Sequence, residues 1–392
     1  MKQRNILFLT GTRADFGKLK PLMEAVEDDP RFCNHIFCTG MHQLKLYGLT
    51  AEEVTKERHS SVHHFLNQYL GEPMEMILAN TIAGLSRYLA ENRPDMIVVH
   101  GDRVETLAGA IVGVMKNILV AHIEGGERSG TVDEMIRHAV SKLSHLHFVA
   151  NKEAAARLEQ MGEDESRIFV IGSPDIDVMV SDKLPTIEEV KVHYEIPFEN
   201  YSILMFHPVT TENEHMDEYA NQLVDALLEA DGHYVVIYPN NDEGTHYILN
   251  AYKRLEENKR FVIYPSIQFE RFLTLLKNAE SCIGNSSAGM REAPFYAIPT
   301  INIGTRQRDR FKYASIINCG YEKRDILESL RKSRSLNIVR PSAHFGSGDS
   351  RRGFLDVISG ELCWKIGAQK QFCDLPLCDL SSMAKQSRKH VA

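Results

Sequence analysis

Short apolar runs recur along the chain, and helix-length amphipathic segments separate them. The runs do not alternate with polar residues, so each predicts a strand that is buried on both faces of its sheet. The alternation of strands with helices predicts parallel sheets with right-handed crossovers. In the first half the runs span 6–10, 35–39, 61–65, 96–100, 119–123, 146–150 and 169–172. In the second half they span 203–206, 234–238, 261–264, 282–284, 300–303 and 316–319.

These runs predict an α/β protein with two Rossmann-like, doubly wound domains and a cleft between them. The series breaks at a polar linker near 174–198, so residues 1–175 are expected to form a first domain and residues 198–350 a second. The length of 392 residues also exceeds what one hydrophobic core usually serves. We expect a helix within 351–378 to return to the first domain, and the polar end, 379–392, to be frayed.

Composition narrows the class of ligand. With 43% hydrophobic and 25% charged residues the chain has the composition of an ordinary globular protein. Its net charge of −8 does not favour binding to nucleic acid or to an anionic membrane. An anionic ligand would need a local basic pocket. No apolar run approaches the roughly 20 residues of a membrane helix, and no secretory leader is visible. The seven scattered cysteines indicate reduced thiols in a cytoplasmic protein, with no metal site.

Polar residues at strand ends are the first candidates for chemistry, because ligands of open parallel sheets bind there. After the first run comes a turn with Gly11 and Gly17, and between them stands Arg13, whose guanidinium fork suits a diphosphate. A plain β–α turn is the alternative. After the run 96–100 come Asp102 and Arg103, which could equally be a simple ion pair.

Four acids follow the run 119–123 on two adjacent segments: Glu124, Glu127, Asp133 and Glu134. A carboxylate that is crowded by others and partly buried can hold a proton near neutral pH, as a general acid or base must. The alternative for Asp133 and Glu134 is a favourable place at the positive end of a helix dipole. The spacing is not that of a regular metal site, although it does not exclude a divalent ion.

The second half carries a candidate phosphate site. His207 and Asn240 follow its first two strands, and Ser286 and Ser287 stand between a strand and a helix. Small hydroxyl residues with free backbone N–H groups form an anion nest, although an N-cap turn would look the same. Further along, Glu292 is placed to accept both hydroxyls of a ribose, and Arg306 follows the next strand.

The order and spacing of these motifs resemble the UDP-N-acetylglucosamine 2-epimerases, most closely the hydrolysing branch of bacterial sialic acid synthesis. The resemblance runs from the first strand to about residue 320, and more loosely to about 375. It rests on Gly11-Thr12-Arg13, Thr39-Gly40-Met41-His42, His100-Gly101-Asp102-Arg103, His122-Ile123-Glu124-Gly125-Gly126-Glu127, Asp133 to His138, Phe206-His207-Pro208, Gly284-Asn285-Ser286-Ser287-Ala288-Gly289, Arg291-Glu292-Ala293-Pro294 and Gly304-Thr305-Arg306-Gln307.

The resemblance implies a GT-B fold and specific roles. Asp102, Glu124 and Asp133 match the family's catalytic carboxylates, and His42 matches a histidine near the sugar. It further implies no cofactor and no metal, UDP-N-acetylglucosamine as substrate, UDP as product, and a homodimer or dimer of dimers. The residues that match UDP contacts are Arg13, Arg103, His207, Asn240, Ser286, Ser287, Glu292 and Arg306, with Phe272 against the uracil.

The implied reaction releases UDP by anti elimination, through 2-acetamidoglucal, and water then adds to give N-acetylmannosamine. Other readings stay open at this point: a hydrolysing epimerase of a UDP-2,4-diacetamido-6-deoxy sugar on the legionaminic acid pathway, a GT-B glycosyltransferase, a non-hydrolysing epimerase, or a UDP-sugar sensor. In the preferred reading the second domain holds UDP and the first works on the sugar. The cleft must therefore close for the reaction, and an open form would separate the two sites.

Overall fold

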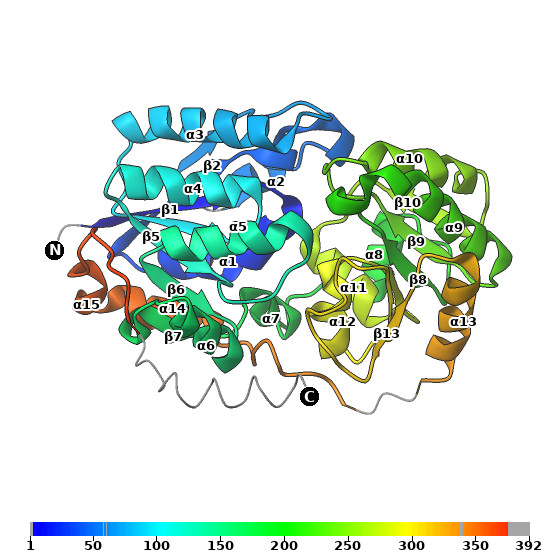
Figure 1. Ribbon diagram of the computed structural model, residues 1–392. Coiled ribbons are helices and arrows are strands. Elements are labelled where there is room, and N and C mark those ends of the chain that lie inside the picture. Colours follow the sequence, from blue (N-terminus) through cyan, green and yellow to red (C-terminus); the bar gives the residue numbers. More distant parts are fainter. Residues whose placement is uncertain (1–2, 58, 60, 337–339, 375–392) are drawn as a thin grey trace, which may run out of the picture.

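Two α/β domains lie side by side in the computed structural model, which describes residues 3–336 and 340–374 except 58 and 60 (Figure 1). The first domain holds a seven-stranded parallel sheet in the order β3-β2-β1-β4-β5-β6-β7. Its strands are β1 (Arg4–Thr10), β2 (Phe32–Cys38), β3 (Ser61–His64), β4 (Met96–His100), β5 (Leu119–Ile123), β6 (Leu146–Val149) and β7 (Ile168–Val170).

The second domain holds a six-stranded parallel sheet in the order β10-β9-β8-β11-β12-β13. The predicted fold class is confirmed, since each apolar run overlaps one observed strand and the sheets have the predicted seven and six strands. The strands of this sheet are β8 (Ser202–Met205), β9 (Tyr234–Ile237), β10 (Phe261–Tyr264), β11 (Cys282–Gly284), β12 (Thr300–Ile303) and β13 (Ile316–Cys319).

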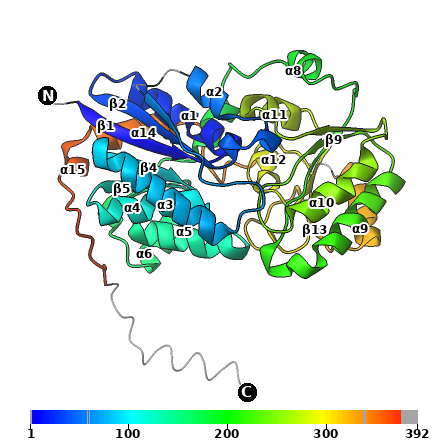
Figure 2. The ribbon, with the colours of Figure 1, turned by 90° about the horizontal axis from the view of Figure 1, so that it is seen from above.

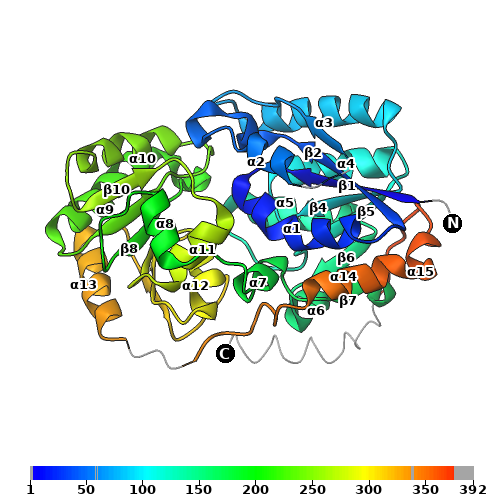
Figure 3. The same ribbon diagram turned by 180° about the vertical axis from the view of Figure 1, so that it is seen from behind.

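Helices cover both faces of the first sheet, which explains why its strands are apolar throughout. In β1, Ile6 and Phe8 pack on one side, and Leu7 and Leu9 on the other. The face with Leu7 is covered by α3 (Met74–Glu91), α4 (Val104–Met115) and α5 (Thr131–Leu143), which are stacked in Figure 1. The opposite face carries α1 (Arg13–Glu27), α2 (Ala51–Lys56) and α14 (Ser350–Ser359), seen from behind in Figure 3.

The second sheet is covered in the same way. One face packs against α9 (Met216–Glu229), α10 (Thr245–Tyr252) and α13 (Lys323–Arg334), and the other against α8 (Ile187–His193), α11 (Phe269–Lys277) and α12 (Glu292–Phe295). Figure 2 shows α9 and α10 on one side of this domain and α8 on the opposite side. Because both faces are buried, these strands also lack a polar alternation.

The chain passes between the domains twice. It leaves the first domain through α7 (Pro174–Met179), and α14 later returns to pack against α1 and α7 (Figure 3). The helix expected within 351–378 corresponds to α14. The first domain also contains α6 (Lys152–Gln160) and, after α14, α15 (Glu361–Trp364). The predicted frayed end, 379–392, lies outside the described residues, as does Cys378. Among the described residues no helix combines the length and the apolar character needed to cross a membrane.

The strand orders fix where a ligand can bind. In both sheets the chain first winds one way from a central strand and then the other, so a switch point lies between β1 and β4, and a second between β8 and β11. Loops that leave such a pair of strands diverge to opposite faces and open a crevice at the carboxyl ends. The candidate motifs after β1, β4, β8 and β11 therefore all flank a switch point.

Candidate active site between the domains

Two adjoining cavities lie between the domains at these switch points. The larger has a volume of about 290 Å³, and the smaller, about 140 Å³, shares Asp102, Asp133, Ser287 and several neighbours with it. Of the predicted site residues, only Glu124 and His42 do not line the larger cavity. Those that do are Arg13, Asp102, Arg103, Asp133, His207, Asn240, Phe272, Ser286, Ser287, Glu292 and Arg306. Glu124 lines the smaller cavity.

The larger cavity has an apolar end with a carboxylate beside it. Phe272 lies in its wall together with Tyr238 and Pro265, which suits a flat ring. Glu292 begins α12, and its Oε1 forms an ion pair with Lys18 Nζ at 2.7 Å. Glu292 Oε2 is buried without a hydrogen-bond partner among the described residues. It is therefore free to accept from a ligand hydroxyl.

His207 is held as a neutral donor. Its Nδ1 accepts a hydrogen bond from the backbone N–H of Asn240 at 3.0 Å, so the remaining ring proton resides on Nε2. Burial, reinforced by the charges of Arg306 and Arg103, holds the pKa of His207 well below its usual range. At neutral pH the ring is uncharged, and it can offer Nε2–H to a phosphate oxygen in the cavity that it lines.

Asp102 and Asp133 form the pair of carboxylates at the boundary of the two cavities. Asp102 accepts hydrogen bonds from Ser129 Oγ at 2.5 Å and from Arg137. Burial opposes its charge, but Arg137 and Arg310 outweigh burial and lower the pKa of Asp102. For Asp133, burial and then the negative Asp102 raise the pKa to about 7. Asp133 therefore ionises near neutral pH while its neighbour stays anionic.

Glu124 is held by cations. Its Oε1 accepts from Arg291 Nη2 at 2.6 Å, and His100 Nε2 lies 3.2 Å from its Oε2. Against the effect of burial, Arg291 and His100 keep the pKa of Glu124 well below its usual range. His100 also donates through Nδ1 to Asp15 at 2.7 Å. Although burial works against the protonated ring, Glu124 and Asp15 raise the pKa of His100 to about 9.

The four acids expected to crowd one another do not form a single cluster. Glu127 binds Arg291, which separates it electrostatically from Glu124. Glu134 accepts from the backbone N–H of Ser129 and lies 3.3 Å from His138 on the outer side of α5. The prediction was wrong in its members, because a sequence does not show which carboxylates are neutralised by a distant arginine. The close pair is Asp102 with Asp133.

His42 is a buried residue of the first domain. The ring is fully buried, with Nε2 3.2 Å from Thr10 Oγ1 and Nδ1 2.7 Å from Thr50 Oγ1. Burial lowers the pKa of His42 to about 4, so the ring is neutral. Because it lines neither cavity, its predicted place beside the sugar stays a prediction.

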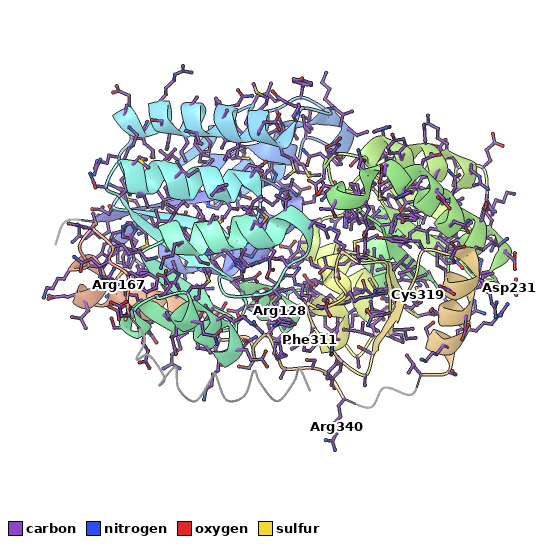
Figure 4. The ribbon with its side chains drawn as sticks, in the orientation of Figure 1. Arg128, Arg167, Asp231, Phe311, Cys319 and Arg340 are labelled. Carbon is purple, nitrogen blue, oxygen red and sulfur yellow. The ribbon has the colours of Figure 1, made fainter. Side chains whose placement is uncertain are left out.

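The cleft is closed, since side chains from the two domains touch directly. Arg13 Nη1 donates to Ser266 Oγ at 2.8 Å, and Arg306 Nη2 donates to Asp133 Oδ2 at 3.0 Å. Figure 4 shows Arg128 and Phe311 at this junction, on the loop before α5 and the loop after β12. Those loops meet so closely that a Cβ on Gly130 would overlap the carbonyl oxygen of Arg306.

The sequence did not single out several cations of the site. Arg137 stands four residues after Asp133 on α5, a spacing that places both on one helix face and could have indicated it. Lys18 lies on the first helix after Arg13, and Arg310 follows Arg306 by four residues. His100 could have been identified as a site residue from its position at the end of β4. Lys18, His100, Arg137 and Arg310 all line the smaller cavity, as does Arg291.

Two doubly wound domains whose switch points face the cleft between them define the GT-B class of fold. Residues 24–359 match the family model described as UDP-N-acetylglucosamine 2-epimerase, and the chain belongs to this family. It is 50% identical over 377 residues to the UDP-N-acetylglucosamine 2-epimerase of Neisseria meningitidis serogroup B, covering 95% of this chain and all of that one. It is 32% identical to the hydrolysing UDP-N,N'-diacetylbacillosamine 2-epimerase of Legionella pneumophila, over 88% of this chain and 93% of that one.

The fold is also shared with solved structures. The Methanocaldococcus jannaschii UDP-GlcNAc 2-epimerase in complex with UDP-GlcNAc and UDP matches with a TM-score of 0.77 at 22% identity. The match covers 91% of this chain and 99% of that one. At this level of identity the comparison establishes the architecture, and the chemistry of the present chain must come from its own residues.

Proposed function

We propose that the protein is a hydrolysing 2-epimerase that converts UDP-N-acetylglucosamine and water into N-acetylmannosamine and UDP, at the start of sialic acid synthesis. The observation that carries the proposal is the Asp102–Asp133 pair, which stands where a nucleotide cavity meets a smaller polar one. The identity to the Neisseria relative supports the substrate. The hydrolysing outcome is supported by the resemblance and by the name of the Legionella relative.

The first step breaks two bonds of the sugar. A carboxylate removes the C2 proton while the C1–oxygen bond breaks on the opposite face, which gives 2-acetamidoglucal and UDP. The C2 proton is not acidic, so departure of a stabilised leaving group must accompany its removal. His207 Nε2–H, Arg306 and the Ser286–Ser287 segment line the cavity where the diphosphate would acquire charge. Positioned acid–base groups of this kind contribute on the order of 10²–10⁴-fold each.

The second step adds water across the double bond. The hydroxyl goes to C1 and a proton goes to C2 on the face opposite to the one that lost it, so the configuration at C2 inverts. Asp133 suits these proton transfers because its pKa lies at about 7. Asp102 and Glu124 stay anionic, so they suit a base or an electrostatic role. The closed cleft keeps bulk water from the intermediate.

A second candidate keeps the reaction and changes the sugar. The Legionella relative is named for a diacetamido sugar, so a UDP-2,4-diacetamido-6-deoxy substrate is the alternative. The higher identity to the Neisseria relative favours UDP-N-acetylglucosamine. The homodimer or dimer of dimers that the resemblance implies is likewise a proposal, which light scattering in solution tests.

One incubation tests the activity. UDP-N-acetylglucosamine in heavy water, followed by proton NMR, should give free N-acetylmannosamine with deuterium at C2, together with UDP. Formation of UDP-N-acetylmannosamine instead would indicate the non-hydrolysing reaction, and no reaction at all would reject the proposed substrate.

Variants test the site. Asp102→Asn, Glu124→Gln and Asp133→Asn should each abolish turnover while the Kd of UDP stays within about tenfold, because they leave the nucleotide cavity in place. The matched control is Glu153→Gln, which alters an exposed carboxylate on α6. Near-normal turnover in all three variants would show that the carboxylates are not the site.

A further inference from the structure

Glu105 is a buried carboxylate of the smaller cavity that the proposed reaction does not use. It stands in the first turn of α4, is 1% exposed, and lines the cavity together with Asp102 and Asp133. Neither of its oxygens has a hydrogen-bond partner among the described residues. Arg103 Nε, 3.5 Å from Oε2, balances the charge without forming a hydrogen bond.

Two glycines hold this carboxylate close to the backbone of neighbouring loops. A Cβ on Gly11 would lie 3.2 Å from Glu105 Cδ, and one on Gly40 would lie 2.9 Å from Oε1. The loops after β1 and β2 thus approach the carboxylate where side chains would otherwise stand. Gly40 also has a φ of 65°, a conformation that favours glycine.

A charged group in this state is costly. Burying a carboxylate without hydrogen bonds costs several kcal/mol even when a cation is near, and buried polar groups are almost always satisfied. Since protein donors do not satisfy Glu105, the cavity that it lines must supply them. A second cation is not needed, because Lys18, Arg137 and Arg291 already surround the cavity. The donors that fit are neutral hydroxyl groups.

We propose that Glu105 accepts hydrogen bonds from sugar hydroxyls remote from C1 and C2, and so selects a fully hydroxylated hexosamine. The inference rests on the proposed function, which places the phosphate beside Ser287 and Arg306 and places C2 beside Asp102 and Asp133. The hydroxyls at C3, C4 and C6 are the donors that remain. A sugar that lacks one of them leaves a buried carboxylate oxygen unpaired, and sites of this kind reject such analogues strongly.

The test compares UDP-N-acetylglucosamine with its 3-deoxy, 4-deoxy and 6-deoxy analogues on the wild-type enzyme. We expect at least one analogue to lose about 10²–10⁴-fold in kcat/KM. In Glu105→Gln, which keeps the shape and removes the charge, the ratio between parent and that analogue should shrink at least about tenfold. UDP binding and the melting temperature report whether the variant is folded.

A matched control separates recognition from charge balance. Glu53 pairs with Arg13 through its carboxylate, so Glu53→Gln should change kcat/KM for parent and analogue by the same factor. The inference would be overturned if Glu105→Gln lowered kcat/KM for the parent and the analogue by the same factor. It would also be overturned if the wild-type enzyme used all three analogues with a kcat/KM within about threefold of that for the parent. If the wild-type enzyme does not turn over UDP-N-acetylglucosamine, the proposed function itself fails, which is a different result.

Discussion

Arg291 of the second domain donates from Nη2 to Glu124 Oε1 of the first at 2.6 Å, and both side chains are almost completely buried. The same guanidinium binds Glu127 and Ser173, lies 3.4 Å from Asp175, and stands 4.4 Å above the ring of Phe345. One arginine therefore joins a candidate catalytic carboxylate to the opposite domain.

Loss of this arginine should be severe. Arg291→Met removes the cation that three buried carboxylates share, which costs about 3–5 kcal/mol of unfolding free energy. Arg291→Lys keeps the charge but not the fork, so we expect a smaller loss of stability and still a large loss of turnover. Urea unfolding and kcat measure the two effects. Wild-type stability in both variants would contradict the network.

The pH dependence should report Asp133. Burial, Asp102 and Asp242 raise its pKa to about 7, against the opposing charges of Arg306 and Arg103. We expect an ionisation near pH 7 in kcat/KM. Arg306→Gln removes a cation that favours the carboxylate anion, so the pKa must rise. The ionisation should move to higher pH by about one unit, equivalent to about 1.4 kcal/mol. An unmoved profile would assign the ionisation to another group.

Gly130→Ala tests domain closure. The residue has an ordinary φ of −122°, so the substitution strains no backbone, yet its Cβ would overlap the Arg306 carbonyl of the other domain. We expect an unchanged melting temperature, a lower kcat, and a larger radius of gyration in solution scattering. In Gly367→Ala, the matched control, the new Cβ meets nothing within 4 Å. Equal kcat in both variants would show that closure tolerates the methyl group.

The segment after α15 should stabilise α5. Lys370 Nζ donates to the carbonyl oxygens of Ser141, Lys142 and Ser144 at 3.1, 2.9 and 2.7 Å, and it also pairs with the buried Glu163. We expect Lys370→Ala to lose about 2–4 kcal/mol in urea unfolding, because four acceptors lose a charged donor. Lys365→Ala, which removes an exposed pair with Glu361, should cost under about 0.5 kcal/mol. Equal losses would deny the capping role.

The sequence predicted the sheets well, because strands buried on both faces leave continuous apolar runs that turn residues interrupt. The sequence also predicted that Asp102, His207 and Ser286 belong to one site, because strand ends at the switch points converge. It could not predict the state of the acids. Whether Glu124 or Asp133 retains a proton depends on Arg291 and Arg306, which lie more than 150 residues away along the chain. Nor could the sequence predict that the ring of His42 is fully buried between Thr10 and Thr50.

The contact between Arg306 and Asp133 makes the pKa of Asp133 depend on the arrangement of the two domains. When the domains part, Arg306 leaves with the second domain, while the negative Asp102 remains beside Asp133 on the first. Burial and Asp102 raise the pKa of Asp133 while Arg306 lowers it, so closure of the domains changes two opposing influences on this carboxyl group at the same time. The proton affinity of this carboxyl group therefore belongs to the assembled cleft, because residues of both domains and the burial between them set it.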